Sequence, residues 1–175
     1  MAGRKSGHCL VPGEGADGGR MFGKKLSEYF AFQRWILILI AAVWLVRLVL
    51  SMAGMSGVAR WASINIVVLA GLVYFAIAVH TKGFGSYKQL LGVLFIQTAL
   101  AHVLIALAIA LGILTGTDSI YTAPEFFGGN NGRNWAHVAI HLTLGVFLLP
   151  LIGWLIASPI LFFTKKLKPG FQRVI

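Results

Sequence analysis

The sequence predicts an all-α integral membrane protein, a bundle of four transmembrane helices with both termini on the cytoplasmic side. Of its 175 residues, 58% are hydrophobic and only 11% are charged, which is too apolar a composition for a water-facing surface. The apolar residues also fall in four runs, each as long as the roughly 20 residues that a helix needs to cross the hydrocarbon.

The four predicted spans lie between two basic segments. We expect them at about 33–52, 61–80, 89–114 and 135–163, within a transmembrane domain that covers 29–164. Residues 1–28 form a basic arm that lacks the apolar core of a secretory signal, and we expect it to be disordered. Residues 165–175 form a basic tail. A start at Met21 instead of Met1 would leave every span intact.

The last predicted span carries signals for its beginning and for bends. Asn134 directly precedes it, where an amide side chain can accept a hydrogen bond from the first free backbone N–H groups of a helix. Pro150 and Pro159 lie inside it. Since proline has no N–H to donate, each should release a carbonyl one turn earlier and bend the helix.

Orientation follows from the basic residues that flank the spans. Twelve Lys and Arg fall on one side of the predicted membrane and two, Arg60 and Arg133, on the other. The crowded side is therefore cytoplasmic, which places the 115–134 connection outside and predicts a multi-pass protein of the inner (plasma) membrane. The twelve are Arg4, Lys5, Arg20, Lys24, Lys25, Arg34, Lys82, Lys88, Lys165, Lys166, Lys168 and Arg173.

The same asymmetry explains the net charge of +10, so we expect the lipid bilayer as partner and no nucleic acid. Several enzyme classes lack their signatures: the chain has no phosphate-binding glycine loop, no zinc-protease helix motif and no nucleophile elbow. No carboxylate lies inside a predicted span, which argues against a carboxylate proton relay. We do not expect the protein to be an enzyme by itself.

Ionisable side chains inside the predicted spans are few and costly, so each is a candidate for function. His102 lies near the middle of the third span. His137 and His141, four residues apart near the outer end of the fourth, share one helix face with Gly145. Arg47 lies in the outer half of the first span.

Two kinds of cofactor could use these histidines. A haem b between two helices needs one axial imidazole from each side and small residues where the macrocycle passes, which His102, His141 or His137, and Gly145 could supply. At 1.5 Å per residue, His102, His141 and His137 lie roughly 16, 9 and 3 Å from their outer helix ends, so His141 is the better partner of His102. Alternatively, the three histidines could hold Zn, Cu or non-haem Fe, with Glu125 folded in from the connection.

Arg47 has three possible partners. It could reach the outer headgroups, pin the long connection through Asp118 or Glu125, or meet an anionic ligand group such as a haem propionate. His102 could also be satisfied without any cofactor, by a hydrogen bond to Thr98, Gln97 or Asn65.

The stretch from Asn134 to Gly145, with its His137 and His141, resembles the outer half of a ligand helix in small four-helix b-type cytochromes of bacterial membranes. That resemblance covers one helix of the four. It implies haem binding and electron transfer, and proteins of that group hold two haems on four histidines spread over both halves of the bilayer. Here the candidate pair lies in the outer half, and His80 has no inner partner on another helix.

The sequence thus supports a leading hypothesis and two alternatives. The first is a small haem-binding electron-transfer subunit that exchanges electrons with a quinone or with other membrane subunits. The second is a non-catalytic accessory or scaffold subunit of a larger membrane complex. The third is a membrane metal site made of His102, His137 and His141.

Overall fold

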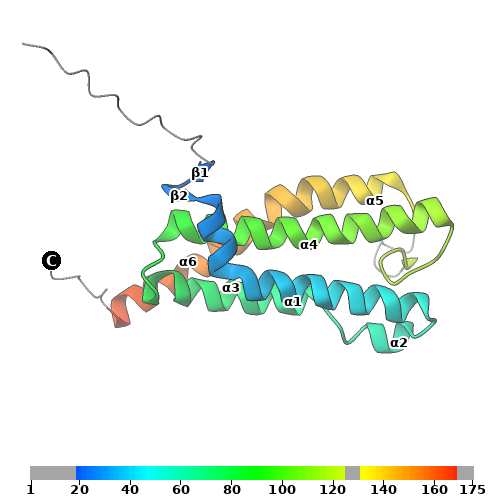
Figure 1. Cartoon of the computed structure of the whole chain (residues 1–175), viewed down its shortest axis with the longest axis horizontal. Helices are drawn as coiled ribbons and strands as arrows, with labels where there is room; N and C mark the ends of the chain where they lie inside the picture. The colour runs from blue at the N-terminus through cyan, green and yellow to red at the C-terminus, as the bar shows by residue number, and fades with distance from the viewer. Residues whose placement is uncertain (1–18, 125–130, 169–175) are drawn as a thin grey trace, which may run out of the picture.

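A computed structural model of the chain describes residues 19–124 and 131–168, which are mainly helical. Figure 1 shows the long helices side by side along one axis, with the two short strands at one end and the 115–134 connection at the other. Four helical segments of the described residues are long and apolar enough to cross a membrane. This confirms the predicted helical bundle and is compatible with a multi-pass membrane protein.

The described elements include the four predicted helical spans, in the predicted order. They are β1 (Arg20–Met21), β2 (Lys24–Lys25), α1 (Leu26–Met52), α2 (Ser56–Ala59), α3 (Ile64–Thr81), α4 (Tyr87–Thr115), α5 (Trp135–Ile140), the π-helix η2 (His141–Leu148) and α6 (Leu149–Leu167). The last three form one continuous helical segment, 135–167. The short helix α2 lies in the connection between α1 and α3, where the sequence predicted no helix.

Regular secondary structure begins at residue 20, within the arm for which we expected disorder, and residues 1–18 of that arm lie outside the described residues. β1 and β2 pair as a short antiparallel hairpin, and α1 begins at Leu26 instead of near 33. Two side chains hold the hairpin on the bundle: the Tyr29 hydroxyl donates to the Met21 carbonyl at 3.1 Å, and the Gln89 amide donates to the Phe22 carbonyl at 2.9 Å. These two hydrogen bonds give the basic, glycine-containing segment the tertiary contacts that its own sequence does not provide.

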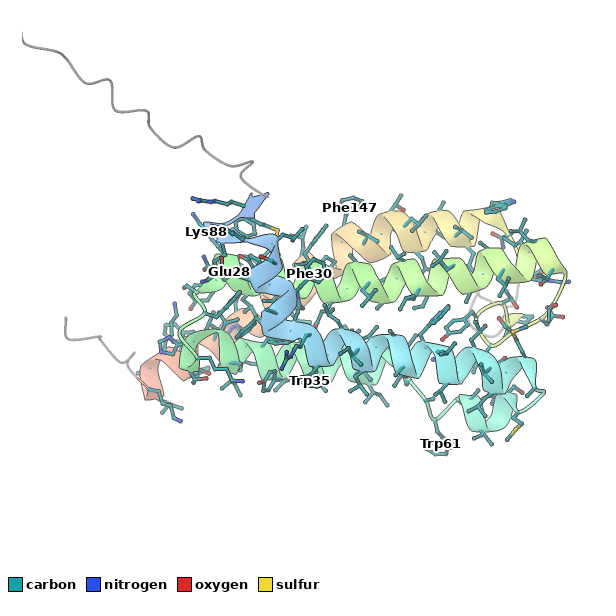
Figure 2. The ribbon with its side chains drawn as sticks, viewed as in Figure 1. Glu28, Phe30, Trp35, Trp61, Lys88 and Phe147 are labelled. Atoms are coloured by element: carbon teal, nitrogen blue, oxygen red, sulfur yellow. The ribbon has the colours of Figure 1, made fainter. Side chains whose placement is uncertain are left out.

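The outer surface of the bundle is apolar. Trp35 is 69% exposed and Trp61 is 88% exposed, and Figure 2 shows Trp61 and Phe147 pointing away from the bundle. An apolar surface this extensive is unusual for a protein surrounded by water.

The two ends of the bundle differ in charge. We call one the basic end, because Lys24, Lys82, Lys88 and Lys165 lie at the helix termini there. The other is the long-loop end, which carries the 115–134 connection. The interior of the basic-end half is a cluster of apolar side chains that includes Tyr29, Phe75, Leu90 and Leu161.

The fourth helical segment changes neighbours along its length. α6 packs against both α3 and α4, whereas α5 and η2 pack against α4, and in Figure 1 α5 lies above α4 while α6 continues towards the basic end. The change falls at η2 and Pro150. Pro150 cannot donate to the carbonyl one turn earlier, and the Leu149 N–H reaches back to the Leu144 carbonyl in the wider π-helical pattern. The predicted disturbance at Pro150 therefore takes the form of a π-helix.

Candidate functional site

The candidate histidines form a continuous chain of side chains in the long-loop half of the bundle. Nδ1 of His102 on α4 lies 2.8 Å from Nδ1 of His141 on η2. Nε2 of His141 lies 3.2 Å from Nε2 of His137 on α5. Nδ1 of His137 lies 3.0 Å from the carbonyl oxygen of Gly132 in the long connection. We call these residues the histidine chain.

Local features of the fourth helical segment position the rings of His137 and His141. The Asn134 side chain accepts a hydrogen bond from the His137 backbone N–H at 2.8 Å, which confirms the predicted N-cap and sets where α5 begins. Four residues separate His137 from His141, so both rings lie on one face. His137 is buried, and His102 and His141 are half-buried.

Gly145 makes room for the His102 ring. A Cβ atom on Gly145 would lie 2.5 Å from His102 Nδ1 and 2.6 Å from its Cγ, closer than atoms can approach without displacement. The sequence assigned the space at Gly145 to a haem macrocycle. In the structure, the imidazole of His102 fills it.

A cavity of about 560 Å³ opens beside the histidine chain. It lies where the fourth segment diverges from α3, and its volume is within the range of small-molecule sites. Most of its wall is apolar. The polar side chains in the wall are the three histidines, Arg47, Asn65, Gln97, Thr98 and Tyr121. The apolar lining residues are Ile64, Val68, Leu69, Leu72, Leu94, Ala101, Ile105, Ile120, Leu149, Ile152, Gly153 and Ile156.

Arg47 and Tyr121 both line the cavity. The Arg47 guanidinium lies 5.3 Å from the centre of the Tyr121 ring, a cation–π arrangement. The Tyr121 hydroxyl donates to the Trp44 carbonyl at 3.4 Å. Burial raises the pKa of the Tyr121 phenol, and the nearby positive charge of Arg47 offsets part of that rise. The phenol therefore keeps its proton at neutral pH.

The long connection is pinned to the bundle by bonds other than those expected. The Ile120 N–H donates to the Ser51 hydroxyl of α1 at 2.7 Å. Asp118, a predicted partner of Arg47, instead pairs with Arg133 at 3.3 Å. Glu125, the other predicted partner and a predicted metal ligand, lies outside the described residues. Tyr121 lines the cavity, and no local signal in the sequence marked it as part of the cavity wall.

As the side chains pack here, His102 and His141 contact each other directly through Nδ1, with no iron-sized gap between those two atoms. Iron held between two imidazoles needs two metal–nitrogen bonds of about 2 Å each, and so a nitrogen separation near 4 Å. The facing Nδ1 atoms are 2.8 Å apart, which is a hydrogen-bond distance.

The three rings also do not converge on one point, because His141 presents a different nitrogen to each neighbour. Within residues 19–124 and 131–168, no group of three or more His, Cys, Asp and Glu side chains has an arrangement that could hold a metal ion.

The remaining polar candidates take other roles. Gln97 does not meet His102: its amide N–H donates to the Val68 carbonyl of α3 at 3.3 Å. His80 lies at the basic end and contacts the Lys168 carbonyl at 2.7 Å, far along the bundle from the histidine chain.

Comparisons with family models, with curated proteins and with solved structures find no match to this chain. The resemblance of residues 134–145 to four-helix b-type cytochromes therefore stays a prediction.

Proposed function

We propose that this protein is a small subunit of a membrane redox system that binds an amphipathic ligand of the quinone class in the cavity beside the histidine chain. The observation that carries the proposal is the composition of the cavity wall, in which three imidazoles meet a larger apolar surface. A ring with oxygen substituents and an apolar tail satisfies both parts of such a wall.

The polar part of the wall favours an uncharged head group. Imidazoles can exchange hydrogen bonds with carbonyl and hydroxyl oxygens. A phosphate head group would instead call for several cations, and Arg47 is the one Lys or Arg among the described residues that line this cavity. Arg47 is already stacked on Tyr121, where it can orient an oxygen atom of a ligand in the cavity.

In a membrane, the basic end would face the cytoplasm, because Lys and Arg accumulate on that side. The cavity and the histidine chain would then lie in the outer half of the bilayer, where a membrane-soluble ligand can reach them. Electrons would pass to or from another subunit.

The test is a pair of matched valine substitutions on α3. Val68 lines the cavity, so Val68→Phe fills it. Val73 is 48% exposed on the outer surface of the same helix, so Val73→Phe adds the same group outside the cavity. We expect the purified protein in lipid nanodiscs to be thermally stabilised by decylubiquinone and its reduced form, with that stabilisation lost in Val68→Phe and kept in Val73→Phe. Equal binding by both variants would place the ligand elsewhere.

A second candidate is a haem b held by His102 alone. His102 uses Nδ1 for His141, and the described residues give its Nε2 no hydrogen-bond partner. Metal-bound histidines commonly donate their second ring N–H to a neighbour in this way. Absorption spectra of the native protein, oxidised and dithionite-reduced, test it. A Soret band that is lost in His102→Leu and retained in His141→Leu supports one axial ligand, and a flat spectrum rules haem out.

A further inference from the structure

The histidine chain has a direction, which its end at Gly132 determines. A carbonyl oxygen only accepts hydrogen bonds, so the contact of 3.0 Å between His137 Nδ1 and the Gly132 carbonyl requires a proton on His137 Nδ1. A neutral imidazole carries one N–H, so Nε2 of His137 is then an acceptor.

The same reasoning assigns the ring protons of His141 and His102. Nε2 of His141, 3.2 Å from that acceptor, must carry the proton, which leaves Nδ1 of His141 with a lone pair. Nδ1 of His102, 2.8 Å away, must therefore be the donor. Every ring is thus assigned one tautomer, and Nε2 of His102 is left as a lone pair.

The assignment depends on neutral rings, and the surroundings favour them. An ionised side chain in an apolar interior is costly unless it is paired. Neither α4 nor the segment 135–167 contains an Asp or Glu that could pair with an imidazolium. Arg47, which lines the same cavity, adds a positive charge and disfavours another.

We infer that the cavity selects ligands that donate a hydrogen bond to His102 Nε2, and so binds the hydroquinone form in preference to the quinone. This rests on the proposed function, since it concerns the same cavity. His102 lines the cavity, and Nε2 is the polar ring atom that His141 does not occupy. A hydroquinone O–H can donate to this nitrogen. A quinone carbonyl or a methyl ether would bring a second lone pair against it.

The tautomers can be measured without any ligand. Two-bond proton–nitrogen correlations on histidine-labelled protein separate protonated from unprotonated ring nitrogens. We expect Nε2 of His102 unprotonated, and Nε2 of His141 and Nδ1 of His137 protonated, with each signal assigned through single His→Gln variants. A proton on Nε2 of His102 in the neutral protein would overturn the inference.

Selectivity is measured with three probes of similar size: decylhydroquinone, its dimethyl ether and decylquinone. A hydrogen bond to a partly buried acceptor corresponds to about tenfold in affinity, so we expect the hydroquinone to bind about tenfold more tightly than either of the others. His137→Leu removes the anchor at Gly132 and leaves His141 and His102 free to adopt either tautomer. That variant should lose most of the ratio between its affinities for the hydroquinone and the dimethyl ether, whatever the change in its absolute affinity for either probe.

The control is His80→Gln at the basic end, which should keep the full preference. Equal binding of the three probes to the wild type would contradict the inference while leaving a ligand in the cavity. Binding of none of them would contradict the proposed function as well. If His137→Leu does not fold, the tautomer measurement on the wild type still decides.

Discussion

The same four helical segments pack differently in the two halves of the bundle. In the basic-end half, Phe75, Leu90 and Leu161 are at most 1% exposed and pack into one apolar cluster. In the long-loop half, the fourth segment leaves α3, a cavity of about 560 Å³ opens, and imidazoles line it. The long-loop half also has a buried apolar cluster, which includes Ile40, Ile64 and Ile109, but the cavity opens beside it.

The difference begins at one point on the fourth segment. η2 ends at Leu148 and α6 begins at Leu149, immediately before Pro150. After this point, α6 packs against both α3 and α4, whereas α5 and η2 before it pack against α4. A π-helix is a common way to introduce such a change at a functional site.

The largest expected effect compares a buried side chain in the basic-end half, Leu90, with a half-buried one in the long-loop half, Ile105. Leu90→Ala should destabilise the protein by about 2–5 kcal/mol, because a closed core cannot fill the space that is left. Ile105→Ala, with as many atoms removed, should cost less, because Ile105 already faces the cavity and so has fewer packing contacts to lose. Equilibrium unfolding in detergent measures both changes. An equal loss of stability would mean that the cavity half is packed as tightly as the other.

A smaller effect is expected from adding one methyl group to a glycine. Gly145→Ala should cost about 1–3 kcal/mol through overpacking, since its Cβ would overlap the His102 ring. Displacing that ring should also break its contact with His141 and weaken ligand binding.

Gly153→Ala is the matched control for Gly145→Ala. Its Cβ would meet the flexible end of Leu72 at 3.2 Å, so it should change stability less. Thermal unfolding without ligand compares the two variants, and a larger loss of stability in Gly153→Ala would show that Gly145 has no special role.

The smallest effect concerns how stability depends on pH through Tyr121, which lines the cavity. Burial raises the folded-state pKa of Tyr121 above the value near 10 of an unfolded tyrosine. Its contribution to the free energy of unfolding is therefore fully present below about pH 10 and is lost as pH rises from there through the folded-state pKa. Tyr121→Phe should show a shallower fall in unfolding temperature above about pH 10 than the wild type. Identical slopes would mean that the Tyr121 phenol is ionised as easily in the folded protein as in the unfolded chain.

Features that depend on residues close together in the sequence could be predicted from the sequence alone. The four apolar runs, the Asn134 cap and the shared face of His137, His141 and Gly145 all depend on helical periodicity, which acts over a few residues. The apolar surface of the bundle follows from composition in the same way.

Contacts between distant residues were decided only by the tertiary structure. The sequence suggested that His102 and His141 face each other, but their separation depends on how far η2 lies from α4, which packing at Gly145 sets. The docking of Gln89 on the hairpin at Phe22, the pairing of Asp118 with Arg133, and Tyr121 over Arg47 likewise join residues whose approach no local pattern encodes. The reason is that helical periodicity determines which face a side chain occupies, whereas the distance across an interface depends on side-chain packing along two whole helices.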